Sequence, residues 1–212
     1  MLAFSLPLMI SLFIVLIVGL TVHEFAHAWT ADYFGDDTPR LYGRLTLNPL
    51  AHLDIIGSLM LLVAGFGWAK PVPVNMYALE RRSRSAPMLV ALAGPVSNLL
   101  LAIAAGILLG SGLFQRPSTP SEFFPSMYEL LGYFVLFNLV LFFFNLMPLF
   151  PLDGEKVLMY FLPPSGQMTL ESFRRYGSIP LLIVVLLLPI LGIPILEWLV
   201  FRPAYWLANL IT

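Results

Sequence analysis

The segment HEFAH, residues 23–27, has the composition and the spacing of a metal-binding site. His23 and His27 are separated by one helical turn, which places their imidazoles on one face of a helix, about 40° apart around its axis. Glu24 projects to the side of that pair. In an H-E-x-x-H segment the two histidines hold zinc and the glutamate handles the proton of a water molecule. The segment therefore predicts zinc ligands at His23 and His27 and a catalytic acid/base at Glu24.

A third ligand must come from elsewhere in the chain, because catalytic zinc usually takes three protein ligands. The remaining histidine is His52, and the carboxylates in apolar surroundings are Asp54 and Asp153. Asp153 lies in FNLMPLFPLDG, where two prolines break an apolar segment and Gly154 permits an unusual backbone. A broken helix at membrane depth is tolerated only where protein or a wet cavity surrounds it, so this aspartate indicates function. A helix cap at Asp153 is the alternative.

The composition indicates that lipid, rather than water, is the main solvent of this chain. Hydrophobic residues make up 59% and charged residues 11% of its 212 residues, whereas a soluble domain usually contains about 25% charged residues. The formal net charge is −1, so the charge gives no sign of nucleic-acid binding. Cysteine is absent from the sequence, which excludes disulfides and thiolate metal ligands.

The residues of the predicted metal site lie on segments that are long enough to cross a membrane. A spanning helix needs about 20 mostly apolar residues. We expect such helices at residues 6–34, 86–113, 127–149 and 179–199, and the last must be kinked or split by its prolines. The sequence therefore predicts an all-α polytopic membrane protein with about four transmembrane helices and a broken helix that carries the LDG segment.

Two shorter segments and the domain organisation complete this prediction. Residues 55–67 are too few for a span and suit a re-entrant or buried element. Residues 201–211 suit an amphipathic helix at the membrane interface. We expect a single integral-membrane domain over residues 1–212, with its core at about 15–160 and C-terminal helices at about 178–211.

The basic residues are distributed unevenly between the predicted loops. The loop between the second and third spans contains only Arg116, whereas the other loops contain most of the positive charge. The positive-inside rule then places residues 35–85 and 163–177 in the cytoplasm, provided that residues 55–67 return to the side from which they enter. We expect a plasma-membrane protein with its zinc site toward the cytoplasm. The basic residues of the cytoplasmic loops are Arg40, Arg44, Lys70, Arg81, Arg82, Arg84, Arg174 and Arg175.

Several segments together resemble the site-2 proteases, which are intramembrane zinc metalloproteases. They follow the order of that family and cover roughly residues 15–160. The resemblance implies that His23, His27 and Asp153 bind one Zn²⁺ and that Glu24 is the catalytic acid/base. The segments are HEFAH at 23–27, LNPLAHLD at 47–54, GWAKPVPVN at 67–75, AGPVSN at 93–98 and FNLMPLFPLDG at 144–154.

The sequence departs from that family in two places. Many site-2 proteases carry a second glycine after the LDG segment, whereas Glu155 and Lys156 follow Gly154 here. This difference affects the edge of the predicted cleft rather than the ligand. Many members also carry a PDZ domain of roughly 80–90 residues, but no gap between the apolar segments is that long. The chain therefore resembles the small members, and we expect no PDZ domain.

Three further residues are candidates for contact with a substrate. His52 could polarise a substrate carbonyl, or it could hold its loop by hydrogen bonds. Asn98 and Asn145 are amides inside predicted spans, where they could join helices or hold a substrate backbone or oxyanion near the zinc. Asn145 is favoured because it precedes the broken segment. Residues 67–75 are predicted to form an extended loop or edge strand, with which an unwound substrate segment could pair by strand addition. The alternative is a plain loop at the membrane interface.

The function that these expectations support is zinc-dependent hydrolysis of peptide bonds in or near transmembrane segments. The expected partners are transmembrane protein substrates and the lipid bilayer, without nucleic acid. A substrate helix must unwind before attack, because a helix hides its carbonyl groups. The alternatives are a membrane zinc transporter or sensor, a non-proteolytic scaffold with the same ligands, and a zinc hydrolase that acts on a lipid or small amphiphile. A further alternative involves no metal: His23 and His27 would be buried structural histidines, and Glu24 would form a salt bridge.

Overall fold

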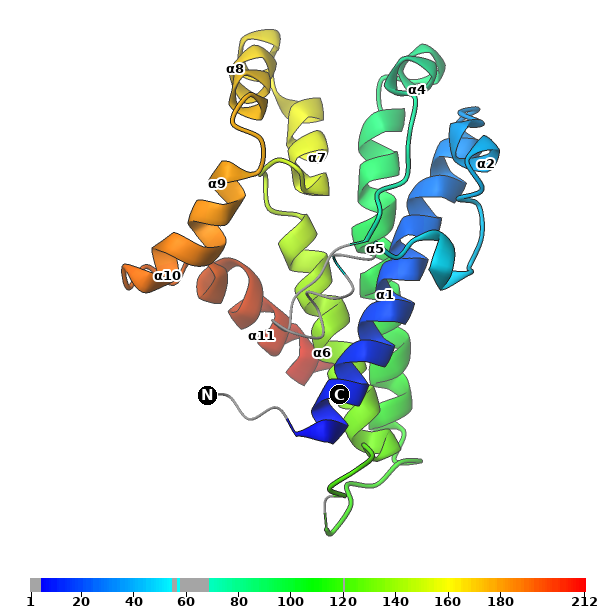
Figure 1. The fold of residues 1–212 in the computed structure, drawn as a ribbon, viewed down its shortest axis with the longest axis vertical. Helices are drawn as coiled ribbons and strands as arrows, with labels where there is room; N and C mark the ends of the chain where they lie inside the picture. The colour runs from blue at the N-terminus through cyan, green and yellow to red at the C-terminus, as the bar shows by residue number, and fades with distance from the viewer. Residues whose placement is uncertain (1–4, 55–56, 58–68, 120) are drawn as a thin grey trace.

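The protein is a bundle of helices around three long ones, α1 (Leu6–Tyr33), α5 (Ala86–Gly110) and α6 (Met127–Asn145) (Figure 1). The structure, a computed structural model, describes residues 5–54, 57, 69–119 and 121–212. Within those residues these three helices are long and apolar enough to cross a membrane. The chain is therefore an all-α polytopic membrane protein, as the sequence predicts.

Shorter helices and turns make up the rest of the described chain. The helices are α2 (Thr38–Leu41), α4 (Met76–Arg82), α7 (Asp153–Phe161), α8 (Pro164–Arg174), α9 (Ile179–Leu182), α10 (Leu188–Ile190) and α11 (Arg202–Ile211). A 3-10 turn covers Pro49–Ala51, and π-helical turns cover Ile183–Leu187 and Glu197–Phe201. The one pairing of extended residues among those described is an isolated antiparallel bridge between Leu53 and Ala69. Most of residues 55–67, the predicted re-entrant element, lies outside the described residues.

Local sequence explains where the long helices begin and end. Helix α6 begins with a capping box, in which Ser126 and Glu129 satisfy each other's backbone N–H groups. It ends at Asn145, four residues earlier than the sequence predicts. Pro148 explains the difference, because proline lacks the N–H of a helical bond and disfavours helix in the residue before it. Helix α1 ends at Tyr33, where Gly35 adopts a φ of 86° that suits glycine.

The predicted span at residues 179–199 is split, which is one of the two outcomes that its prolines predict. The chain turns after α10, where Gly192 has a φ of 76°, and helix resumes close to Pro194. The predicted break is therefore confirmed, and it divides the segment into two parts. Among the described residues, the candidate for a fourth span is a bent pair, α8 together with residues 179–190, with an angle of 76° between its two parts.

Helix α11, at the segment where the sequence predicts an amphipathic helix at the membrane interface, packs on the bundle. Ala204 is buried in one core cluster with Ala102 of α5 and Leu139 of α6. The end of α11 approaches α5 closely, because a Cβ atom on Gly106 would lie 2.8 Å from the carbonyl oxygen of Ile211. Small residues at helix contacts allow this approach in membrane proteins.

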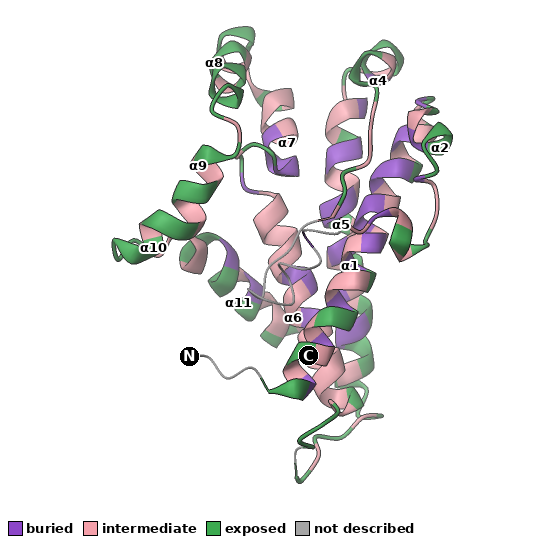
Figure 2. Cartoon of the chain, in the orientation of Figure 1, coloured by how far each residue is buried: buried purple, intermediate pink, exposed green. Residues whose placement is uncertain are grey.

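The buried residues follow the inner faces of α1, α5 and α6 and the start of α7 (Figure 2). Helices α2, α4 and α8 lie at one end of the bundle, and the loop between α5 and α6 lies at the other end (Figure 1). The loops that contain most of the basic residues thus share one end. The start of α7, which carries Asp153, packs against α5 in the interior.

Candidate metal centre

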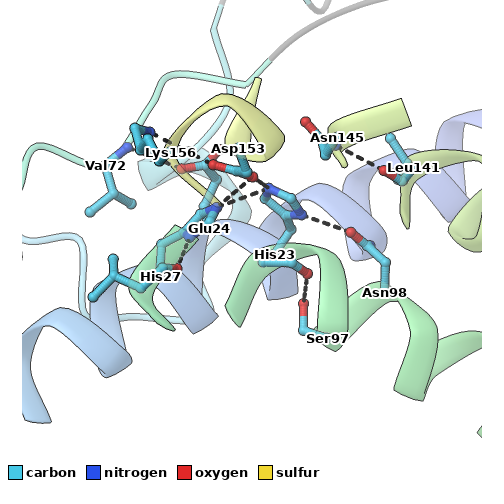
Figure 3. A network of polar contacts seen from close by, with 12 residues as sticks. His23, Glu24, His27, Val72, Ser97, Asn98, Leu141, Asn145, Asp153 and Lys156 are labelled. Atoms are coloured by element: carbon cyan, nitrogen blue, oxygen red, sulfur yellow. Dashed lines mark hydrogen bonds and ion pairs between the residues drawn. The ribbon is translucent and has the colours of Figure 1, made fainter. Parts of the chain in front are cut away.

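Helices α1 and α7 bring His23, His27 and Asp153 together in a buried cluster. The two Nε2 atoms are 3.0 Å apart, and each lies 3.2 Å from Oδ2 of Asp153. Figure 3 shows both imidazoles pointing toward this carboxylate. The histidines come from successive turns of one helix, whereas the aspartate lies 126 residues after His27 on another helix.

The donor set fits a Zn²⁺ ion. Nδ1 of His27 lies 2.7 Å from the Val90 carbonyl, which can only accept, so this nitrogen carries the ring proton. Nδ1 of His23 lies 2.7 Å from Oδ1 of Asn98, which also only accepts, so the ring proton of His23 is on Nδ1 as well. Both Nε2 lone pairs therefore face each other and a carboxylate oxygen. Tetrahedral zinc with bonds of about 2.0–2.1 Å keeps its ligand atoms about 3.3 Å apart, which is close to the observed spacing.

Gly94 of α5 leaves the room that this cluster needs. A Cβ atom at that position would lie 2.3 Å from Nε2 of His27 and 2.6 Å from Nε2 of His23. Any side chain there would occupy the space in front of the metal-binding atoms. The glycine of the AGPVSN segment thus lets a helix backbone form one wall of the site.

Asp153 is the first residue of α7, and its carboxylate points into the cluster rather than capping the helix. The N-cap is Leu152, and no side chain caps the first turn. The predicted reason for Gly154 is also corrected, because its φ is not in the left-handed region. A Cβ atom on Gly154 would instead lie 2.2 Å from the carbonyl oxygen of Leu146, so glycine is needed for close approach.

Helix α7 is also held by an ion pair between its buried Glu155 and the exposed Arg174. Glu155, which is 2% exposed, accepts hydrogen bonds from Arg174 at 2.6 and 3.0 Å. A carboxylate so deeply buried needs such a bidentate partner. The glutamate that stands where many site-2 proteases have glycine therefore joins α7 to the end of α8.

Glu24 lies beside the cluster and is not one of its three members. It is buried, and its Oε2 accepts a hydrogen bond of 3.0 Å from the backbone N–H of Val72. Val72 belongs to the extended stretch 69–75, which ends where Asn75 caps α4. The structure thus places the predicted acid/base between the histidines and this stretch (Figure 3).

The other predicted site residues lie around the cluster or outside it. His52 is not a member of the cluster; its Nε2 contacts the Thr46 carbonyl at 2.8 Å, which matches the loop-holding alternative. Asn145 donates to the Leu141 carbonyl at 3.0 Å. The oxyanion interpretation of Asn98 is not favoured, because its Nδ2 already donates twice, to Gly19 and Asn138.

Three groups contribute contacts to the site that the sequence does not predict. The Val90 carbonyl and Asn138 act through hydrogen bonds whose partners are distant in the sequence. Lys156 places its Nζ 3.8 Å from Oδ1 of Asp153, the carboxylate oxygen that faces away from the histidines. The spacing of Asp153 and Lys156, three residues apart at the start of a helix, was the available signal for this last contact.

Two histidines and one carboxylate in a buried cluster of an all-α membrane protein are a donor set that zinc enzymes use. The chain is 44% identical over 181 residues to the Bacillus subtilis protein named "Putative zinc metalloprotease YwhC", and the match covers 85% of this chain and 82% of that protein. The chain therefore belongs to this family of zinc metalloproteases, and Zn²⁺ is its cofactor.

Two mycobacterial relatives bear the same family name. The chain is 36% identical over 208 residues to "Putative zinc metalloprotease Rip2" of Mycolicibacterium smegmatis, covering 93% of this chain and 74% of that protein. It is 31% identical over 200 residues to the protein of the same name from Mycobacterium tuberculosis H37Rv, covering 92% and 71%. No protein-family model and no solved structure matches the chain.

Proposed function

We propose that this membrane zinc metalloprotease is an intramembrane endopeptidase of the site-2 type, which cuts transmembrane segments of other proteins. His23, His27 and Asp153 are the proposed zinc ligands, and Glu24 is the proposed acid/base. The observation that carries the proposal is the cluster of three electron-pair donors beside a buried glutamate, among helices that are long enough to cross a membrane.

The chain's own residues have separate roles in hydrolysis. Bound Zn²⁺ supplies a Lewis acid, which lowers the pKa of water toward about 7 and polarises a peptide carbonyl. Glu24 accepts the proton of the attacking water and passes it to the leaving nitrogen as the C–N bond breaks. The Val72 N–H holds Oε2 of Glu24, so we assign the proton to Oε1. Asn145 remains our candidate for holding the substrate backbone.

The extended stretch 69–75 is the proposed docking edge for an unwound substrate. It lies next to Glu24 through the Val72 N–H, so a segment paired with it would pass the acid/base. A peptide that adds to an extended edge is held by its backbone, which suits substrates of varied sequence. Glycine or proline in a substrate helix would ease the necessary unwinding.

We place the metal centre in the cytoplasmic half of the membrane. About 17 residues of α1 precede His23, which at about 1.5 Å per residue corresponds to roughly 25 Å of a core about 30 Å thick. The basic loops share the end of the bundle that carries α2, α4 and α8 (Figure 1). In a plasma membrane this arrangement would cut substrates near their cytoplasmic ends and release domains inward.

The test is cleavage of a transmembrane peptide by the purified chain in liposomes. Glu24→Gln should reduce the rate by at least a few hundred-fold, the usual scale for general acid–base catalysis. It should keep about one zinc per chain, because Glu24 is not one of the three cluster residues. Glu80→Gln, at an exposed position on α4, is the matched control.

Two outcomes would contradict the proposal. Near-normal cleavage by Glu24→Gln would refute the mechanism. A wild-type chain that binds zinc but cleaves no peptide would favour a sensor, a scaffold or another substrate class.

A further inference from the structure

Two buried amides connect α5 and α6 to the metal centre. Asn98 of α5 and Asn138 of α6 are both 0% exposed. A buried amide is costly unless its polar atoms are hydrogen-bonded, and lipid supplies no partners. Both amides are bonded within the protein, and their chain of hydrogen bonds ends at His23.

The orientation of Asn98 is set by its neighbours. Its Nδ2 lies 3.1 Å from the Gly19 carbonyl oxygen and 2.9 Å from Oδ1 of Asn138. Turning the amide over would place its oxygen against the carbonyl oxygen of Gly19, which can only accept. Oδ1 of Asn98 must therefore face Nδ1 of His23, and that nitrogen must donate the hydrogen bond of 2.7 Å.

Asn138 is held in the same way one step further from the metal centre. Its Nδ2 donates to the Phe134 carbonyl at 2.8 Å, so its Oδ1 is directed to Asn98. Gly19 provides the space for this contact, because a Cβ atom there would lie 3.0 Å from Oδ1 of Asn138 and 3.6 Å from Nδ2 of Asn98. The helices α1, α5 and α6 thus meet at one continuous set of hydrogen bonds.

We propose that Asn98 and Asn138 are positioning residues of the zinc site, forming a relay from the Phe134 carbonyl to His23. The relay keeps the proton of His23 on Nδ1, so the Nε2 lone pair always faces the metal. It also fixes the angle of the ring. This inference rests on the proposed ligand role of His23. Mutating a residue that holds the other ring nitrogen of a ligating histidine typically weakens metal binding about 10- to 100-fold.

Two asparagines on α6 provide a matched test. Both Asn138 and Asn145 donate Nδ2 to the carbonyl four residues earlier, but only Asn138 accepts from Asn98. We expect Asn138→Leu to weaken zinc binding about tenfold, the lower end of the usual range. Asn145→Leu should leave zinc affinity unchanged. The measurement is chelator competition on the full chain in detergent, without substrate. Equal zinc affinities for the two variants would overturn the relay.

A second measurement begins with the wild-type chain, so its first result does not depend on whether a variant folds. In the zinc-free wild-type chain, ¹⁵N NMR of the histidine rings should show His23 protonated at Nδ1. Asn98→Leu should leave a mixture of the two ring tautomers and weaken zinc binding about 10- to 100-fold. An unprotonated Nδ1 in the wild-type chain would overturn the proposal. The two experiments measure zinc affinity and the protonation of the His23 ring. They therefore remain decisive even if the chain cleaves no peptide.

Discussion

Replacing Gly154 with alanine tests how α7 presents Asp153 to the zinc. The added Cβ atom would lie 2.2 Å from the carbonyl oxygen and 2.4 Å from the carbonyl carbon of Leu146, and 2.5 Å from the Met147 carbonyl oxygen. These are backbone atoms at the end of α6, and they cannot rotate away as a flexible side chain can. The start of α7 must therefore move.

The size of that movement follows from the contact distances. Carbon and oxygen atoms in contact need more than 3 Å, so the backbone of α7 must shift by about 1 Å to accept the methyl group. Zinc ligands tolerate only about 0.2 Å of error in their bond lengths. Asp153 is the neighbour of Gly154, so it would lose its place as a ligand. We expect zinc affinity close to that of Asp153→Ala and at least about 100-fold less activity.

The assay is zinc affinity by chelator competition, followed by peptide cleavage in liposomes. Gly132→Ala is the control on α6, because a Cβ atom there meets nothing within 4 Å. Since alanine is the better helix former, the control should gain about 0.5–1 kcal/mol of stability and retain zinc. Wild-type zinc affinity in Gly154→Ala would show that the junction between α6 and α7 does not position Asp153, and the argument from close packing would fail.

Three further experiments test the site and its orientation. Asp153→Ala should bring zinc well below one ion per chain by metal analysis; undiminished content would remove Asp153 from the ligand set. Gly94→Ala should also prevent zinc binding while the helical circular-dichroism signal persists, because its Cβ would lie 2.3 Å from Nε2 of His27. Asp37→Cys and Gln115→Cys place single thiols at exposed positions of a cysteine-free chain. In sealed cells an impermeant thiol reagent should label the variant at 115 and spare the one at 37; the reverse pattern would invert the proposed topology.

The parts of the fold that sequence predicts well depend on local spacing. The histidine pair is separated by one helical turn, so its common face follows from helix geometry alone. The three long helices follow from apolar length, and the break after α6 follows from the chemistry of Pro148. Asp153 is conspicuous for the same local reason, since it is a charge placed at that break.

The parts that sequence does not predict depend on contacts between distant segments. Asn98 is 75 residues from His23 and 40 from Asn138, and no periodicity connects these positions. An amide inside a span looks the same in sequence whether it holds a ligand, a substrate or another helix. The contact of α11 with α5 and α6 is not predicted for a similar reason, because an amphipathic pattern suits a membrane interface as well as the surface of these helices.

The location of the metal centre follows from how a membrane protein satisfies its polar atoms. Lipid supplies no hydrogen bonds, so buried polar groups must find partners within the bundle. At the crossing of α1, α5 and α6 these partners are provided for His23 by Asn98, which Gly19 and Asn138 hold in place. The Val90 carbonyl is the partner of His27, so each imidazole has one direction left for its lone pair. The direction is shared by Nε2 of both histidines and by Oδ2 of Asp153. These three electron-pair donors repel one another when no proton lies between them, and a divalent cation at their centre would bind all three. The hydrogen bonds that stabilise the bundle and those that prepare the zinc site are therefore the same.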